Sequence, residues 1–116
     1  MAAVAPRSDY RTEFKALTGG TKTDCFTVPT GFWWDVTALS VCASTGSAGT
    51  ATIAIFDNSA STEFVLRYTD EVPATAALEY EGLPMHLEAG DIIRVTGANL
   101  QHVFCTYILG APGGRA

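Results

Sequence analysis

Charged side chains and cysteines are both scarce in this sequence, and each shortage argues against a class of protein. Charged residues make up 16% of the 116 positions, compared with about 25% in typical soluble domains. The three cysteines, Cys25, Cys42 and Cys105, form no Cys-x-x-Cys pair, so their spacing supports neither a zinc site nor a thioredoxin-like site. Each lies in an apolar strand pattern and is expected to act as a small core hydrophobe. Spacing alone leaves open whether two of them form a disulfide.

Histidines and catalytic motifs are sparse as well. His86 and His102 are the only two histidines and lie sixteen positions apart, so they cannot form the His-x-His pair of a jelly-roll metal site. The sequence has no Gly-x-Ser-x-Gly elbow and no phosphate-binding loop. We therefore assign no catalytic, cofactor-binding or metal-binding residues, and we expect a protein that is not an enzyme and uses no cofactor.

Long apolar runs are missing too. No run approaches the roughly 18 residues of a membrane span, and Met1–Arg7 lacks the apolar centre of a signal peptide. We expect synthesis in the cytoplasm and no membrane partner. The net charge of −5 argues against nucleic acid as a partner, because binding it requires a basic patch.

The sequence is rich in the signals of short β-strands and turns. In Leu87–Val95, a turn at 88–91 supplies a glycine for positive φ, and Ile93 and Val95 then alternate with Arg94. Turn residues recur about every 8–12 positions, which predicts an all-β fold. We expect a single antiparallel β-sandwich of jelly-roll type, with about eight strands. An extended N-terminal arm with room for a short strand covers 1–23, the sandwich covers 24–109, and a Gly-rich tail covers 110–116.

Seven runs bounded by turn residues are the expected strands. They are Glu13–Thr18, Cys25–Val28, Phe32–Ala43, Thr50–Asp57, Glu63–Tyr68, Ile92–Thr96 and His102–Leu109. Residues 69–82 are expected to form a long connection, within which 76–80 form either a short strand or a helical turn.

The longest expected strand changes phase along its length. Its first half directs Phe32, Trp34 and Val36 toward the core, whereas its second half favours Leu39 and Val41. A bulge near Thr37-Ala38 would reconcile the two halves.

The two signs of charge are distributed unevenly. Residues 1–23 hold four basic and two acidic side chains, whereas the remainder holds three basic and ten acidic ones. A basic arm on an acidic body favours contact between the arm of one copy and the body of another. The alternative is that a short terminal segment simply carries solvated charges. The candidate interface residues are Arg7, Tyr10, Arg11, Phe14, Lys15 and Trp33.

Trp33-Trp34 is the sharpest local feature. Neighbouring strand residues point to opposite faces, so Trp33 should face outward if Trp34 enters the core. Three interpretations stay open for an outward tryptophan: an interface between copies, cover by the arm of its own chain, or a platform on which a sugar stacks.

Several stretches together resemble small virion structural proteins of tailed phages and related gene-transfer particles. They are Thr27–Phe32, the β pattern through Val41-Cys42, Thr50–Ile55, Leu87–Val95 and Val103–Leu109. The Leu-x-x-Gly-Asp turn also resembles the jelly rolls of the tumour necrosis factor and complement C1q families, whose members are usually secreted trimers.

The phage resemblance implies a non-enzymatic, homo-oligomeric building block of a virion, such as a head decoration, head-fibre base, neck or tail component. Its partners would be copies of itself and other virion proteins, and its N-terminal arm would serve assembly. The alternative function is a lectin-like module that recognises a carbohydrate through Trp33 or Tyr80.

Overall fold

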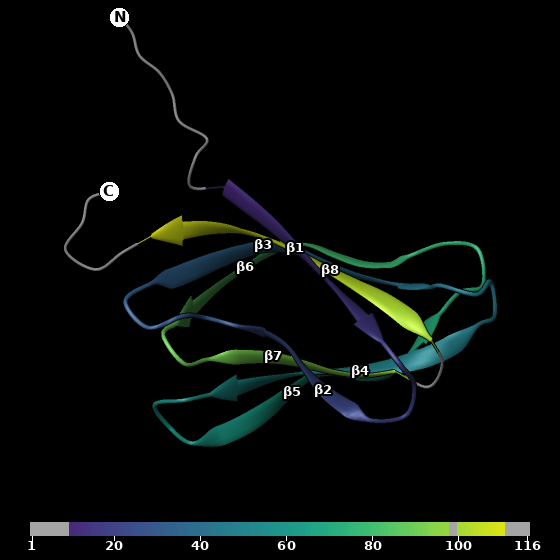
Figure 1. The fold of residues 1–116 in the computed structure, drawn as a ribbon, viewed down its shortest axis with the longest axis horizontal. Coiled ribbons are helices and arrows are strands. Elements are labelled where there is room, and N and C mark those ends of the chain that lie inside the picture. The colour runs from purple at the N-terminus through teal and green to yellow at the C-terminus, as the bar shows by residue number, and fades with distance from the viewer. Residues whose placement is uncertain (1–9, 98–99, 111–116) are drawn as a thin grey trace, which may run out of the picture.

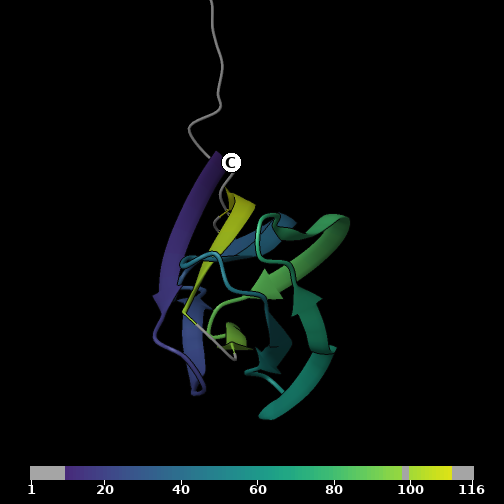
Figure 2. The same cartoon turned by 90° about the vertical axis from the view of Figure 1, so that its right-hand side faces the viewer.

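Two antiparallel β-sheets pack face to face in the computed structural model, which describes residues 10–97 and 100–110 and, of 81–84, the backbone alone. Figure 1 shows the two sheets as an upper and a lower layer, and Figure 2 shows them from one end. The strands are β1 (Tyr10–Leu17), β2 (Lys22–Thr27), β3 (Trp33–Ala43), β4 (Gly49–Asp57), β5 (Thr62–Val72), β6 (Leu78–Glu88), β7 (Ile92–Gly97) and β8 (Gln101–Gly110). The expected all-β antiparallel sandwich is confirmed.

The strand order follows a simple rule. One sheet has the order β1-β8-β3-β6 and is called here the β1 sheet; the other has the order β2-β7-β4-β5 and is called the β2 sheet. The β1 sheet contains the hydrogen-bonded pairs β1 with β8 and β3 with β6, and the β2 sheet contains the pairs β2 with β7 and β4 with β5. In each pair the two strand numbers add up to nine. The chain is therefore wound like one long hairpin that is folded over itself, with its closed end between β4 and β5.

The N-terminal part of the sandwich differs from the expectation. Strand β1 begins at Tyr10 rather than Glu13, and it pairs with β8 from Tyr10 opposite Ile108 to Leu17 opposite Gln101. Strand β2 already begins at Lys22. Residues 10–17 are thus an integral edge strand, and the sandwich does not start at residue 24. The rest of the expected arm, 1–9, and the expected tail beyond residue 110 lie outside the described residues.

Strand β6 also departs from the expectation. Residues 78–88 form one continuous strand, although the sequence suggested a long connection through residue 82. The connection was expected from Pro73 and the small residues near it. Pro84 lies inside the observed strand, although a proline donates no backbone hydrogen bond and is rarely found inside a sheet. The strand order explains why it is tolerated, since β6 lies at the edge of the β1 sheet.

The bulge expected in β3 is confirmed. Its register shifts between Val36 and Ala38 against both of its neighbours, β6 and β8. As a result Trp34, Val36, Leu39 and Val41 are all buried in the core. Phe32 was expected there as well, and that is wrong: it precedes β3 and is 38% exposed. Full burial of such side chains stabilises the fold by about 1.5–3 kcal/mol each.

The turn between β6 and β7 is hydrogen-bonded to the β4–β5 turn and to the segment that follows β2. Gly90 has φ of +90°, and a Cβ there would lie 2.5 Å from the side-chain nitrogen of Asn58. The Asp91 carboxylate is 8% exposed and accepts backbone N–H bonds from Glu88 at 2.8 Å and Asn58 at 2.9 Å. Val28 donates its N–H to the Asp91 carbonyl at 3.0 Å. One short turn thereby positions the β4–β5 turn and the segment after β2.

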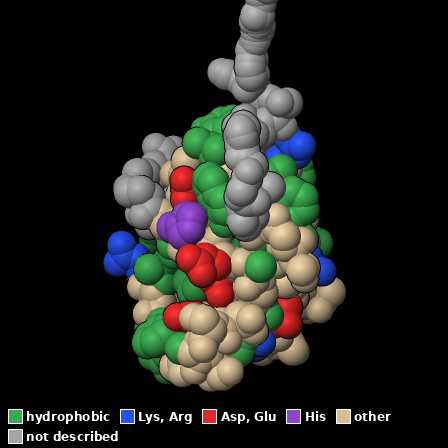
Figure 3. All heavy atoms as spheres, turned by 90° about the vertical axis from the view of Figure 1, so that its left-hand side faces the viewer, with side chains coloured by type: hydrophobic (Ala, Val, Ile, Leu, Met, Phe, Trp, Pro, Cys, Tyr) green, Lys and Arg blue, Asp and Glu red, His purple; other side chains and the backbone are tan. Residues whose placement is uncertain are grey.

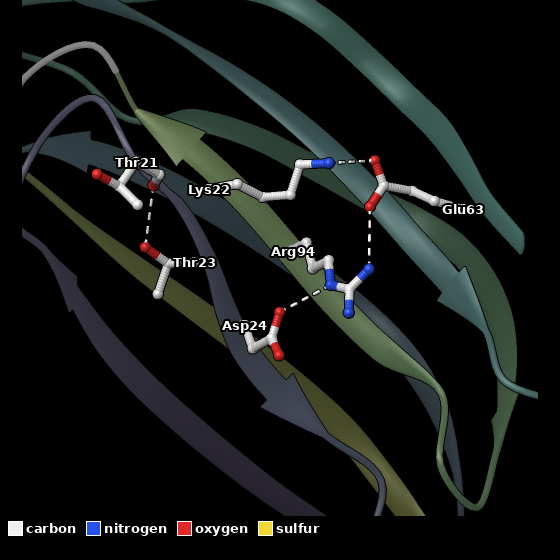
Figure 4. A network of polar contacts seen from close by, with 6 residues as sticks. All are labelled: Thr21, Lys22, Thr23, Asp24, Glu63 and Arg94. Atoms are coloured by element: carbon white, nitrogen blue, oxygen red, sulfur yellow. Dashed lines mark hydrogen bonds and ion pairs between the residues drawn. The ribbon is translucent and has the colours of Figure 1, made fainter. Parts of the chain in front are cut away.

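A charge network crosses the outward face of the β2 sheet (Figure 4). Arg94 on β7 donates to Asp24 at 2.7 Å and to Glu63 at 3.1 Å, and Lys22 reaches the other oxygen of Glu63 at 2.8 Å. The Arg94 guanidinium also lies 4.6 Å from the ring centre of Phe56 on β4. The bonds from Lys22 and from Arg94 hold the pKa of Glu63 below its ordinary value. All four strands of this sheet are therefore linked on their outward side.

We expect Asp91→Ala to lower the free energy of unfolding by about 2–3 kcal/mol, because two part-buried backbone hydrogen bonds lose their charged acceptor. Urea denaturation at one fixed protein concentration measures this loss. The exposed Glu71→Gln is the control and should change the value by less than about 0.5 kcal/mol. Equal effects of the two substitutions would show that the turn does not hold the loops.

The second prediction concerns acid stability. A carboxyl group with a lowered pKa adds stability above its unfolded value, near 4.5, and loses that contribution as the pH falls through the lower folded value. Glu63→Gln should therefore have a lower Tm than the unchanged protein at pH 7, and the difference should shrink steadily as the pH falls below the unfolded value. Thermal melts across this range test it. A gap that does not shrink as the pH falls contradicts the assignment.

Candidate interaction surface

The candidate residues on β1 lie at an edge of the β1 sheet. Tyr10, Arg11, Phe14 and Lys15 are all exposed, and Arg7 lies outside the described residues. Strand alternation divides the four, because Leu17 is buried and shares its side of β1 with Arg11 and Lys15. Tyr10 and Phe14 therefore point outward, away from the β2 sheet, with 50% and 66% of their surfaces exposed.

The strand register assembles an aromatic pair that sequence reasoning missed. Phe14 lies opposite Phe104 on β8, and the two rings meet edge to face with their centres 5.0 Å apart. Phe104 in turn lies opposite Ser40 on β3. The alternation within β8 indicated that Phe104 would oppose Val103 and Cys105 in direction, but no local signal gives its partner on a distant strand.

Small and polar side chains occupy the middle of this outer face. Thr12 and Thr106 bring their hydroxyl oxygens to 3.1 Å, and Thr106 lies opposite Ala38. A shallow depression here is lined by Thr12, Ala38, Ser40, Glu79, Phe104 and Thr106, with Leu39 beneath. This surface of the β1 sheet is therefore hollowed at its centre and carries aromatic side chains along β1. We use the name outer face for this surface of the β1 sheet.

Trp33 lies on the same outer face, at the start of β3. It pairs with Glu88 on β6 and Gly110 on β8, and it is half-buried. A Cβ on Gly110 would collide with the indole, so the absence of a side chain there lets Trp33 lie against β8. Its ring centre is 5.3 Å from that of His86. Trp34, by contrast, stacks on Tyr107 in the core with ring centres 3.8 Å apart.

Acidic and imidazole groups surround Trp33. His86 Nδ1 lies 2.6 Å from the Asp35 carboxylate, and His86 Nε2 lies 3.8 Å from that of Glu88. Figure 3 shows hydrophobic, acidic and histidine side chains beside one another at this end of the molecule. An open hollow is lined by Gly31, Phe32, Trp33, His86, Glu88 and Ala89.

The inner side of β1 holds a polar contact beside the core. Tyr107 donates its hydroxyl to Glu13 at 2.5 Å, and burial followed by this bond raises the pKa of Tyr107. Burial, with a smaller contribution from Glu13, raises the pKa of Cys105 to about 12. Burial likewise raises the pKa of Cys25 to about 11. Both thiols are therefore protonated at neutral pH, which makes them poor nucleophiles.

The other cysteine and site expectations have mixed outcomes. Cys105 is a buried core residue, as expected, whereas Cys25 and Cys42 are half-buried, and all three are free thiols. Tyr80, proposed as a sugar platform, is 8% exposed. Its hydroxyl donates to Asp70 at 2.7 Å, so it cannot serve as one. Within the described residues, no three His, Cys, Asp or Glu side chains are arranged to hold a metal ion.

No protein-family model matches this chain, and neither does any curated protein sequence. In the part of the chain that the structure describes, no helix is long and apolar enough to cross a membrane. Function must therefore be inferred from the winding of the strands and from the outer face.

Proposed function

We propose that this chain is a non-enzymatic building block of a phage-like virion that assembles with copies of itself through the outer face. The main observation in support is the exposed aromatic pair Phe14 and Phe104, with Tyr10 further along the same side of β1. Aromatic side chains gathered on one surface are typical of the buried centre of an interface. Burial against a second copy would remove this apolar area from water.

The winding of the strands supports a jelly-roll sandwich. Pairing of β1 with β8, β2 with β7, β3 with β6 and β4 with β5 is what rolling up one long hairpin produces. Jelly rolls of this kind are frequent in viral capsid and lectin domains. The fold alone does not decide between these two functions, so the choice between them has to be argued from the side chains on the surface.

A second apolar surface, on β5, is less suited to self-association. Its exposed side chains are Phe64, Val65, Leu66 and Tyr68, with exposures of 56%, 55%, 36% and 75%. Neighbours in a strand such as Phe64 and Val65 point to opposite sides, so these side chains do not form one face. The β5 ladder is also interrupted by register shifts on either side of Ile53, and Thr69 has φ of +46°. Such bulges protect a sheet edge from pairing with another chain. Phe14 and Phe104, by contrast, share one side.

Charge favours a contact that repeats from copy to copy. Arg11 and Lys15 lie on β1 at one edge of the β1 sheet, and Glu13 between them accepts a hydrogen bond from Tyr107, which leaves this strand with a net positive charge. Asp35, Glu79 and Glu88 lie on β3 and β6 toward the opposite edge. When two edges of one sheet carry opposite charge, the β1 edge of one copy fits the β6 edge of the next. Contacts of this head-to-tail kind close into rings when the rotation allows it.

The first test compares two phenylalanines that differ mainly in their location. Phe14→Ala should dissociate the homo-oligomer, whereas Phe64→Ala, on the other sheet, should leave it intact. Native mass spectrometry and sedimentation give the oligomer mass of each variant, and circular dichroism shows that both remain folded. A monomeric parent protein, or dissociation by Phe64→Ala alone, would overturn the proposal. Membership of a virion requires the chain to co-purify with particles at a fixed copy number.

The second test concerns the N-terminal segment. Deletion of residues 1–9 keeps all of β1 and should lower the oligomer mass, because the basic Arg7 would no longer reach the acidic side of a neighbour. Higher salt should weaken the full-length oligomer in the same way. An unchanged mass for the truncated chain would rule out assembly through the arm. The matched control is deletion of 111–116.

A further inference from the structure

The hollow beside Trp33 has the size and the walls of a small-ligand site. It measures about 400 Å³, within the roughly 300–1,000 Å³ of typical small-molecule sites. The loop before β3 contributes Phe32, β3 contributes Trp33, and the end of β6 contributes His86 and Glu88. The hollow shares only Glu88 with the charged edge of the proposed self-association, and that contact gives no role to Trp33 or Phe32, so the hollow requires a separate explanation.

The aromatic floor of the hollow is held in place before any ligand binds. The Trp33 indole lies against the bare backbone of Gly110 on one side and near the His86 ring on another. Phe32 is positioned by a turn in which its N–H donates to the Pro29 carbonyl at 3.2 Å. Rigid aromatic groups lose little entropy on binding, and this increases affinity.

The polar groups around the floor are ordered and remain accessible. The 2.6 Å contact with Asp35 fixes the orientation of the His86 ring, which directs Nε2 toward Glu88. The side chains of Asp35 and Glu88 are 46% and 74% exposed. A carboxylate accepts several hydrogen bonds, so Glu88, which lines the hollow, retains acceptor capacity toward a ligand.

We infer that this hollow binds a neutral saccharide ring. The apolar C–H face of a sugar would stack on Trp33 and Phe32, while its hydroxyl groups would donate to Glu88 and contact His86. An amphipathic ring of this kind needs an aromatic face next to acceptors, and the hollow provides both. The Glu88 carboxylate at the rim, with Asp35 next to it on the far side of His86, disfavours phosphate and acidic sugars through like-charge repulsion. The inference does not depend on the proposed assembly.

The test begins with a glycan array that contains neutral and acidic glycans, probed with the intact full-length protein. The strongest neutral glycan is then titrated calorimetrically against the protein and its variants. Trp33→Ala and Glu88→Gln should each weaken binding by about tenfold or more. Phe64→Ala, an exposed phenylalanine on the other sheet, is the matched control and should bind normally. Because Trp34 is 1% exposed, any change in tryptophan fluorescence on binding should disappear in Trp33→Phe.

Native mass measured on the same variants separates this inference from the proposed assembly. Loss of glycan binding in Trp33→Ala with an unchanged oligomer supports the saccharide site. A silent array, or binding that survives both Trp33→Ala and Glu88→Gln, overturns it. Simple alkylammonium compounds form a further arm: if they bind and neutral glycans do not, the hollow is a cation site, and the saccharide assignment is wrong.

Discussion

The Asp91 carboxylate is the constraint on which the arrangement of one end of the sandwich depends. It accepts hydrogen bonds from a backbone N–H of its own turn and from one of the β4–β5 turn. The backbone carbonyl of Asp91 also accepts a hydrogen bond from the N–H of Val28. Gly90 is required beside it, since a side chain would meet both an unfavourable φ and Asn58. These contacts fix where β6 ends and β7 begins. They therefore also place Glu88 and the loop before β3, which form the rim of the Trp33 hollow.

The outward-facing side chains of the two sheets differ in whether they find partners within the chain. On the β2 sheet, Arg94 links Asp24 to Glu63 and covers Phe56, so charges and ring are partnered within one chain. On the β1 sheet, Phe14 and Phe104 contact each other but remain exposed. The charged centre of the first face is therefore complete in the single chain. The second gains stability only when something else covers it, and for this reason the proposed assembly uses it.

The sequence predicted what alternation and turn chemistry determine. The phase change in β3, the outward direction of Arg94 and the need for Gly90 all follow from local rules, and the structure agrees. Strand partners follow from long-range pairing, which no local pattern encodes. The meeting of Phe14 with Phe104 and the gathering of His86 and Glu88 around Trp33 were missed for this reason. Pro73 and the small residues near it led to the wrong expectation for β6, and only the strand order shows that β6 is an edge where Pro84 is tolerated.

The bulge in β3 connects the core to the outer face. Strict alternation from Trp34 and Val36 would bring Ala38 and Ser40 inward and turn Leu39 and Val41 outward. The extra residue reverses this, so the large side chains enter the core and the small ones reach the outer face. The depression over Ala38 and Ser40 exists because of that reversal. A surface with aromatic side chains along β1 and a low centre along β3 can receive the aromatic side chains of another copy. The packing of the core thus determines the shape of the surface proposed for assembly.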